Sequence, residues 1–562
     1  MKKLGVTKQD LIAMIMLSSV FFLMSIWGLG NTNTPLTTVS FHTSDGEGFY
    51  IDLGHMEKVK SVNVLLKKAP DPISFKIYEG SPGNFSYLTE TSFKGYYSWE
   101  SIIINVETRY IRFILGPSSG EIAEIMVVGS GDKIIPINSI RGEGIDDETL
   151  RNLIDEQDKV EYPITYLSET YFDEIYFVRT AEEYLNLEEP YECAHPPLGK
   201  LIMAIGILVF GYNPFGWRIM GVIFSTLMIP IMYLLSKELF ETRVAAFISA
   251  FLWVFEFMHF TMGRIGTVDT YVVFFSLLSQ FFFFTYLKDA LKNKNDDRLL
   301  FFAVLFFSLG FSTKWIVIFG FIGNVFLLTA FRLKDLLKSQ SHWASRISGL
   351  LRYPFSPLFN FLLIGILVYF STFIPYMMVG HTLLDVFGIQ FGMYRYHAML
   401  EATHPFASPW WSWPLIRTPV WLYVSYLPNR MVSTITCMGN PTIWWFGVFC
   451  LVFVVAKTVF KKDLACLYII TIFLFQWMFY ALISRCVFLY HFYSDVPFLV
   501  FAVTALLNDL WERKNIKYRK MTVLSYLIIV VIAFILFYPV ISGIPCSITR
   551  RDSLRLFNSW IF

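Results

Sequence analysis

The amino-acid sequence predicts a mainly helical, polytopic membrane protein that carries one all-β module on the outer side of the membrane. Hydrophobic residues make up 55% of the 562 residues, above the roughly 45–50% typical of soluble globular proteins. They are concentrated in runs close to the roughly 20 residues that a helix needs to cross the hydrocarbon core. The polar stretch 31–192 instead contains short segments of alternating hydrophobicity, which is typical of β-strands.

The N-terminal apolar run, residues 11–29, is predicted to be a retained first transmembrane helix. Lys2, Lys3 and Lys8 precede this run, as they would precede the apolar core of a secretory signal. A cleaved signal, however, has a shorter apolar core and ends in small residues. This run is long enough to span the membrane and ends in Trp27-Gly-Leu-Gly30.

A β-sandwich is predicted over residues 35–132. Segments such as Ser61-Val-Asn-Val-Leu65 and Ser74-Phe-Lys-Ile-Tyr78 alternate polar and apolar residues between turn-forming positions. A series of such short strands is typical of a small sandwich. The segment Thr108-Arg-Tyr-Ile-Arg-Phe113 resembles the discoidin type of sandwich, which implies a glycan as a partner. The alternative is a spacer that binds no ligand.

Further transmembrane spans follow Pro190 and bring the total to about eleven, judged by the length that a bilayer requires. They are predicted near residues 218–236, 244–261, 269–287, 299–313, 315–332, 359–378, 442–458, 464–482, 488–508 and 521–540. The apolar segment 198–210 is too short to span and is predicted to be an interfacial or re-entrant helix.

The distribution of Lys and Arg predicts that the N-terminus is cytoplasmic. Short basic loops recur on one side, and cytoplasmic loops carry the excess of positive residues. These basic loops lie at residues 237–243, 288–298, 332–352, 457–462 and 513–520. The acidic loop 165–217, the lysine-free loop 379–441 and the tail 546–562 then share the outer side with the β-module.

Charge and cysteine content exclude several classes of protein. A formal net charge of +2 gives no indication of nucleic-acid binding. Six cysteines in a chain of this length do not form a disulfide framework, although a bridge between Cys193 and Cys437 in two outer segments is one alternative. No cluster has convincing metal-ligand spacing, so we expect no metal and no cofactor.

Polar residues gather on the predicted outer face around the acidic pair Asp173-Glu174. Charges in or beside spans are costly and normally face a cavity. Lys and Arg there suit an anionic phosphate, and a nearby carboxylate can act as a general base toward a hydroxyl. The combination predicts group transfer from a lipid phosphate to an acceptor outside the cell. The other candidates on this face are Arg264, Asp269, Lys314, Arg485, Tyr490, His491, His195, Lys200, His397, His404 and Trp411.

Each candidate also has a structural interpretation. Asp269 could simply pair with Arg264, and Lys314 could be a snorkelling residue. Asp173-Glu174 could be the first turn of an amphipathic helix that runs to about Leu187. The tryptophans near 410 could form an ordinary aromatic belt at the membrane surface.

An ordered set of motifs between about residues 170 and 500 resembles the protein O-mannosyltransferases, membrane glycosyltransferases of the GT-C fold. The matching pieces are Asp173-Glu174, His195-Pro-Pro-Leu-Gly-Lys200, Gly263-Arg-Ile-Gly-Thr-Val-Asp269, Phe311-Ser-Thr-Lys-Trp315, Tyr396-His397, His404-Pro405, Trp410-Trp-Ser-Trp-Pro414, Arg485, Phe488-Leu-Tyr-His491 and Pro497. The loop 379–441 is too short for the trefoil-type domain of the eukaryotic members, so the chain looks more like a prokaryotic one.

The resemblance implies a GT-C membrane domain over residues 160–545. It also implies inverting transfer of mannose, or a related hexose, from a polyprenyl phosphate to Ser or Thr hydroxyls of exported proteins. Asp173 would be the general base, and Glu174 would orient the acceptor. Donor phosphate and sugar would contact Arg264, Asp269, Lys314, Arg485, Tyr490 and His491, while His195, Lys200, His397, His404 and Trp411 would support the acceptor or the loops. Cations of the protein would stabilise the leaving phosphate without a metal.

Two other functions compete with this one. A related GT-C enzyme could modify a glycolipid or a cell-wall glycan, as the aminoarabinose transferases do. A transporter or a sugar-binding receptor is the third interpretation. Transporters often show internal repeats and polar breaks near mid-membrane, and neither feature stands out in this sequence. A receptor needs no acids beside phosphate-seeking cations.

Overall fold

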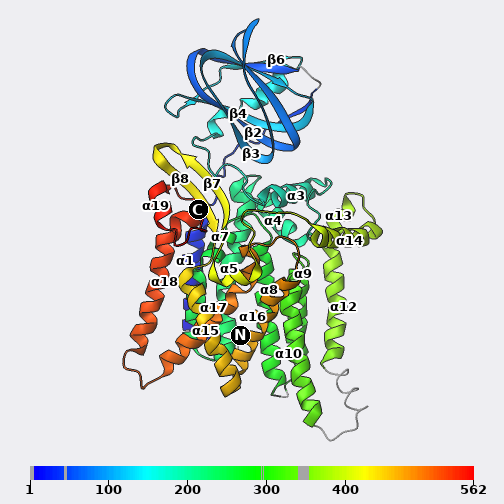
Figure 1. The fold of residues 1–562 in the computed structure, drawn as a ribbon. Helices are drawn as coiled ribbons and strands as arrows, with labels where there is room; N and C mark the ends of the chain where they lie inside the picture. The colour runs from blue at the N-terminus through cyan, green and yellow to red at the C-terminus, as the bar shows by residue number, and fades with distance from the viewer. Residues whose placement is uncertain (1–4, 44–46, 293, 295, 339–353) are drawn as a thin grey trace.

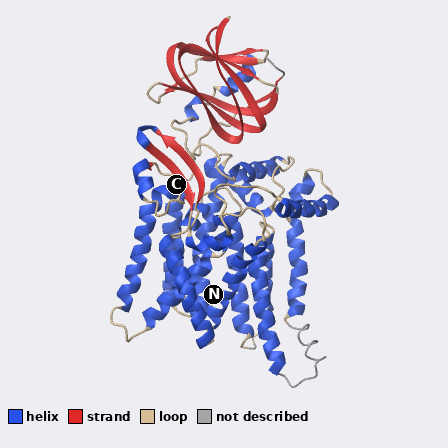
Figure 2. Cartoon of the chain, in the orientation of Figure 1, coloured by secondary structure: helices blue, strands red, loops and turns tan. Residues whose placement is uncertain are grey.

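The structure is a computed structural model that describes residues 5–43, 47–292, 294, 296–338 and 354–562. A bundle of long helices forms one body, and a β-module stands at one end of it (Figures 1 and 2). The helices α3 (Glu174–Asn186) and α4 (Leu198–Phe210) lie between the two. The predicted combination of a helical body with one β-module is therefore confirmed.

The long apolar runs fold as helices of the bundle. These helices are α1 (Lys8–Ile26), α5 (Pro214–Phe240), α6 (Arg243–Val254), α8 (Asp269–Ala290), α9 (Asp297–Phe311), α10 (Val317–Lys338), α12 (Phe355–Ser371), α15 (Pro441–Lys461), α16 (Leu464–Met478), α17 (Val496–Glu512) and α18 (Arg519–Ser542). Within the described residues, 7 segments are long and apolar enough to cross a membrane, those of α1, α5, α8, α10, α15, α16 and α18. The chain is a multi-pass membrane protein.

The observed helix bounds agree with one predicted segment and differ from another. The short segment 198–210 is helical over the same residues, as α4. The predicted span 488–508 begins too early, because Leu489–Ser494 form the 3-10 turn η6 and α17 starts only at Val496. The aromatic residues of η6 are thereby free to line a cavity at the end of the bundle.

The β-module is a 6-stranded antiparallel sheet of β1 (Val39–Thr43), β2 (Gly48–Ser81), β3 (Asn84–Leu115), β4 (Ser118–Gly129), β5 (Ile134–Ile135) and β6 (Ser139–Glu143). The order is β1-β4-β2-β3, with β5 on β4 and β6 on β2. The strands β2 and β3 bend at register shifts, so that Ile77 pairs with both Thr89 and Phe113. The sheet thus folds over its own core.

The module ends later than the sequence predicts. Leu150 of α2 (Asp147–Leu150) and Leu153 of the 3-10 turn η1 (Arg151–Leu153) are fully buried in the same core as Phe49 and Ile77. The predicted end at residue 132 therefore cuts off two strands and this closing turn. The discoidin likeness stays a prediction.

Smaller elements close the end of the bundle that carries the module. The hairpin β7 (Val420–Leu427) and β8 (Met431–Cys437) pairs with β9 (Cys546–Ser547). After α19 (Ile548–Ser553) the C-terminal segment packs back, since Trp560 is buried and donates Nε1–H to the Ile416 carbonyl at 2.7 Å. The remaining short elements are α7 (Phe257–Met262), α13 (Ile374–Met378), α14 (Leu383–Met399), η2 (Gln157–Lys159), η3 (Trp410–Leu415), η4 (Pro428–Arg430) and η5 (Phe479–Leu482).

Candidate active site

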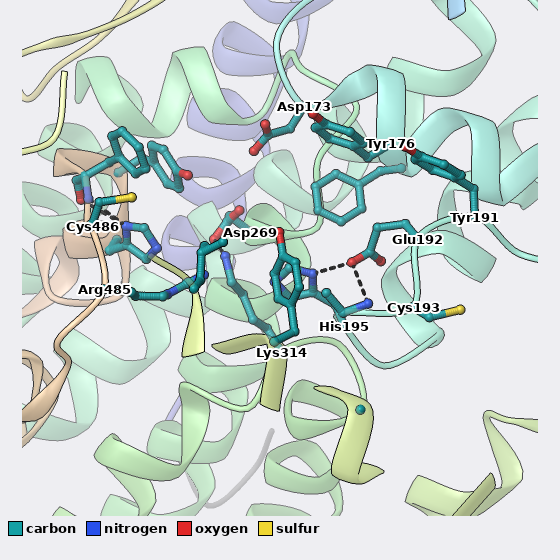
Figure 3. A pocket seen from close by; sticks show the side chains of 18 of the residues that line it. Asp173, Tyr176, Tyr191, Glu192, Cys193, His195, Asp269, Lys314, Arg485 and Cys486 are labelled. Carbon is teal, nitrogen blue, oxygen red and sulfur yellow. Dashed lines mark hydrogen bonds and ion pairs between the residues drawn. The ribbon is translucent and has the colours of Figure 1, made fainter. Parts of the chain in front are cut away.

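A cavity of about 640 Å³ opens at the end of the bundle near α3. The first turn of α3, the loop 191–195, the start of α8, the turn after α9, the helix α14 and residues 485–491 line it. Figure 3 shows charged side chains from separate elements pointing into this space. Seven of the predicted residues line the cavity: Asp173, His195, Asp269, Lys314, Arg485, Tyr490 and His491.

Asp173 stands at the N-cap of α3, where the chain enters the helix under strain. The preceding Phe172 has φ +53°, a left-handed conformation that costs a non-glycine residue about 1–3 kcal/mol. Such strain persists only where the surrounding structure imposes it. The Phe172 ring is held edge-on against Tyr490, with centroids 5.8 Å apart. The backbone therefore holds Asp173 in a defined place.

The Asp173 carboxylate is the unpaired acid of the cavity. Among the described residues it has neither a hydrogen bond nor an ion pair, whereas Glu192 and Asp269, the other acids that line the cavity, each bind a cation. Burial, followed by repulsion from Asp269, raises the pKa of Asp173 to about 7, and Lys314 opposes this rise. A carboxylate with such a pKa is a stronger base than an ordinary one.

Two cations lie in the cavity beside Asp269. Lys314 Nζ is 2.8 Å from Asp269 Oδ1, and both side chains are buried. Asp269 begins α8, and Lys314 lies in the turn after α9, so tertiary packing joins them. Arg485 makes no ion pair within the described part of the chain and lines the same cavity. The alternative that Asp269 pairs with Arg264 is therefore wrong.

Aromatic residues of η6 form one wall of the cavity. Tyr490 and His491 stack with centroids 4.6 Å apart, and the His491 ring is fixed against the backbone of Phe488, with Nδ1 accepting the amide hydrogen at 3.1 Å. The Lys314 Nζ lies 6.0 Å from the centroid of the Tyr490 ring. Tyr490 and His491 therefore line the cavity together with the buried pair of Lys314 and Asp269.

A second charged cluster supports the opposite wall. Glu192 accepts hydrogen bonds from Lys200 Nζ at 2.6 Å and lies 2.8 Å from His195 Nδ1. Although burial opposes it, these two partners hold the pKa of Glu192 well below its usual range. Lys200 also donates to the carbonyls of Glu192 and His195, and His397 Nε2 lies 2.8 Å from the Ala194 carbonyl. Lys200 and His397 thus support the loop from outside the cavity.

Glu174 lies away from the cavity and forms a buried ion pair with Arg218, which we call the Arg218–Glu174 clamp. Arg218 Nε and Nη2 each donate to Glu174 at 2.7 Å, and both side chains are 0% exposed. Glu174 also accepts from the amides of Gly266 and Tyr171. Arg218 donates further to the carbonyl of Leu29. The clamp joins the start of α3 to α5 and two loops, so Glu174 does not face an acceptor as the resemblance implied.

Arg264 does not reach the cavity either. Its guanidinium donates to the backbone carbonyls of Ser25, Trp27, Gly28 and Ser542 at 2.7–3.1 Å. These carbonyls lie at the ends of α1 and α18, where helices leave such groups without internal partners. Arg264 therefore ties two helix ends together and does not line the cavity.

His404 and Trp411 lie outside the cavity. His404 Nδ1 accepts the amide hydrogen of Phe406 at 3.2 Å, and its side chain is exposed. Trp411 is 50% exposed, with the Arg417 guanidinium 5.9 Å from its ring centroid. Both belong to the loop between α14 and α15, but neither contributes to the cavity wall.

Sequence reasoning missed several residues of the site. Glu192, Tyr176 and Tyr191 line the cavity, and Arg218 completes the clamp. Glu192 could have been identified from the sequence, because it is an acid three residues before the candidate His195. Arg218 looked like the border of a span, and a buried partner for Glu174 is visible only in three dimensions.

Two further expectations concern cysteines and metals. All six cysteines are free, so the Cys193–Cys437 bridge is wrong. One group of acids in the described residues is close enough to share an ion, Glu124, Asp155 and Glu156, and none of them lines the cavity. The expectation that catalysis needs no metal stays a prediction.

Two family models match the chain. The "Dolichyl-phosphate-mannose-protein mannosyltransferase" model matches residues 194–359, and the "C-terminal four TMM region of protein-O-mannosyltransferase" model matches residues 382–560. Together these ranges cover most of the membrane body and 13 of the 19 residues that line the cavity. The residue Asp173 and the β-module precede both ranges.

Curated relatives extend this likeness. The chain is 24% identical over 433 residues to the polyprenol-phosphate-mannose–protein mannosyltransferase of Mycolicibacterium smegmatis, which covers 65% of the chain and 81% of the relative. The Mycobacterium tuberculosis protein of the same name is 23% identical over 447 residues, covering 67% and 84%.

A solved structure has the same fold. The Saccharomyces cerevisiae protein O-mannosyltransferase Pmt1-Pmt2 complex bound to the sugar donor superimposes with a TM-score of 0.58 at 12% identity, covering 70% of this chain and 89% of the other. The predicted GT-C fold is thereby confirmed. The chain belongs to the protein O-mannosyltransferase family.

Proposed function

We propose that the protein transfers mannose from a polyprenyl-phosphate donor to Ser or Thr hydroxyls of exported polypeptides. One observation supports this function above the others: the cavity holds an unpaired carboxylate, Asp173, opposite the two cations Lys314 and Arg485. A base for a hydroxyl and cations for a phosphate are what this transfer requires.

The mechanism is a single displacement. Asp173 takes the hydroxyl proton while the hydroxyl oxygen forms a bond to the anomeric carbon of the sugar. The bond from that carbon to the phosphate oxygen breaks, and the polyprenyl phosphate leaves with the electron pair. Lys314 and Arg485 stabilise the negative charge that develops on the phosphate. Attack from the face opposite the leaving group inverts the anomeric configuration.

The direct experiment uses purified protein with radiolabelled polyprenyl-phosphate mannose. A Ser/Thr-rich peptide is one acceptor, and a glycolipid fraction is the other. Label in the peptide supports the proposal. Label that enters only lipid or glycan would instead identify a transferase of the glycolipid-modifying class, and no label in any acceptor would reject both.

The rate of transfer should rise with pH through about 7, because Asp173 acts as a base only after it loses its proton and its pKa is about 7. Below that pH the carboxyl is neutral and transfer is slow. The measurement is kcat/KM for the peptide between pH 5 and pH 9. Asp269→Asn removes the nearby negative charge, so it should move the rise to lower pH. A flat profile over this range would contradict the assignment.

Arg485→Gln should raise the KM for the donor about 10- to 100-fold, since a hydrogen bond to a charged group contributes about 1.5–3 kcal/mol. Competition by polyprenyl phosphate should weaken in parallel. Arg395→Gln is the matched control, because Arg395 is exposed on α14 and does not line the cavity. Equal effects of the two substitutions would remove Arg485 from the donor site.

We further propose that the cavity and the β-module face the outer side and that the N-terminus is cytoplasmic. The 22-residue helix α8 begins at Asp269 in the cavity wall, and its length of about 33 Å carries the chain to the opposite end of the bundle. The basic residues Lys288, Lys292 and Arg298 lie at that end, which suits the cytoplasm. Labelling of a cysteine introduced at Arg141 by an impermeant maleimide in whole cells tests this topology, and protection would reverse it.

A glycan is the ligand that we propose for the β-module. Tyr50, Phe85 and Tyr110 form one group of rings on β2 and β3, and Tyr78 and Tyr87 form another. Tyr87 is 57% exposed, and exposed aromatic rings offer the apolar faces on which sugars pack. Binding of the full chain to a glycan array, lost in Tyr87→Ala, tests this proposal. The absence of binding to any glycan would favour the alternative that the β-module is a spacer without a ligand.

A further inference from the structure

The β-module shares a hydrophobic core with the transferase. Tyr96, Tyr97 and Trp99 of β3 are buried in one cluster with Phe177 of α3 and Trp217 of α5. Phe177 also lines the cavity. A module tethered by a flexible linker would expose such rings to water, at a cost of about 25 cal/mol for each Å² of apolar surface. This face of the sheet is therefore built for a fixed contact.

The same segment of β3 holds the backbone just before Asp173. The Thr170 amide donates to the Tyr97 carbonyl at 2.9 Å, and Thr170 Oγ1 donates to the Tyr96 carbonyl at 2.6 Å. The Trp99 amide donates to Glu169 Oε2 at 3.0 Å. These three hydrogen bonds reach residues that lie three and four positions before Asp173.

Tyr97 connects the β-module to both the transferase core and the segment before Asp173. Its φ of +47° lies in the left-handed region, which costs a non-glycine residue about 1–3 kcal/mol. Its Oη donates to the Pro35 carbonyl at 2.7 Å, and its ring meets Trp217 edge-on at 5.4 Å. The kink in β3 turns the carbonyls of Tyr96 and Tyr97 toward the loop before Asp173.

A second contact holds α3 further along its length. Lys67 of β2 forms an ion pair with Glu182 at 2.6 Å, and its Nζ lies 3.3 Å from the ring centroid of Tyr212. The Tyr96 hydroxyl donates to the same Glu182 carboxylate. The module therefore fixes both the approach to α3 and the third turn of that helix.

We propose that the β-module is a positioning element of the transferase, in which the kinked segment at Tyr96–Trp99 sets the place of the Asp173 carboxylate. This inference rests on the proposed function. It assigns Tyr97 and Lys67 a role in catalysis although neither touches the cavity. A base displaced by about 1 Å can lose about 10²-fold in rate, so this contact has a kinetic consequence.

Tyr97→Ala should lower kcat for peptide mannosylation about 10- to 100-fold, the range expected for a base displaced by about 1 Å. The KM for the donor should stay within about two-fold, because Lys314 and Arg485 lie on other elements. The rise of rate with pH should also shift, since the surroundings of Asp173 change. Tyr97→Phe keeps the ring and should restore most of kcat. Ile103→Ala, at a 67% exposed position on β3 of the same module, should behave as wild type.

Lys67→Met tests the same inference if the Tyr97→Ala protein does not fold. It removes the ion pair to Glu182 and the contact of the ammonium with the Tyr212 ring, and it should lower kcat several-fold at unchanged donor KM. Wild-type kcat and pH profile in both substituted proteins, or in the one that folds, would overturn the inference. An inactive wild-type protein would instead reject the proposed function, so the two failures are distinguishable.

Discussion

Asp173→Asn is expected to lower the rate of mannosyl transfer by about 10²–10⁴-fold, the usual contribution of a general base. Asparagine has nearly the same shape but cannot accept the hydroxyl proton. The donor site formed by Lys314 and Arg485 is left intact, so the KM for the donor should change little. Initial rates with labelled donor and a Ser/Thr peptide measure the first effect, and competition by polyprenyl phosphate measures the second.

Asp71→Asn is the matched control for this substitution, because Asp71 is exposed on β2. It should transfer mannose at the wild-type rate. If Asp173→Asn also kept the wild-type rate, Asp173 would not be the base. If it lost donor binding together with rate, Asp173 would belong to the donor site instead.

Arg218→Met is expected to lower the free energy of unfolding by about 3–5 kcal/mol, because it leaves Glu174 buried without its partner. Both side chains of the pair are 0% exposed, so water cannot replace the lost hydrogen bonds. Thermal unfolding in nanodiscs should show a clearly lower Tm. Transfer should fall too, since the clamp fixes the first turn of α3 beside Asp173.

The double variant Arg218→Met/Glu174→Gln separates the charge effect from simple loss of packing. Replacing both partners of a buried pair removes the unpaired charge, so part of the lost stability should return. Arg141→Ala breaks an exposed pair with Asp147 on the β-module and should leave the Tm nearly unchanged. Additive losses in the double variant would contradict the role of the clamp.

The sequence predicts the membrane body well because apolar length is a strong physical signal. The spans near 218–236, 269–287 and 442–458 all fall inside observed helices. The span near 488–508 failed at its start, since the aromatic residues of η6 are as apolar as a span but serve the cavity. Composition alone does not separate these two uses.

The sequence also predicts that charged residues from separate segments gather in one place, but it does not predict the partner of each charge. A charge beside a span must be compensated, and this rule applies equally to Lys314, Arg264 and Arg218. The compensating groups are a carboxylate for Lys314, four carbonyls at helix ends for Arg264 and the buried Glu174 for Arg218. Only tertiary packing distinguishes them.

The docking of the β-module could not be predicted either. Alternation along β2 and β3 identifies strands, but in a sheet whose two faces are both buried it does not say which face meets another domain. Tyr96, Tyr97 and Trp99 looked like residues of an ordinary strand. Their contact with residues 169–170 depends on the kink at Tyr97, where a tyrosine adopts a conformation that sequence statistics assign mostly to glycine.

In the proposed mechanism, Asp173 activates an acceptor hydroxyl for one direct displacement at the anomeric carbon. The anomeric configuration of the mannosyl-peptide product, determined by NMR and compared with that of the donor, tests it most directly. A single displacement predicts the opposite configuration. Retention would require two displacements through a covalent sugar–carboxylate intermediate and would contradict the account.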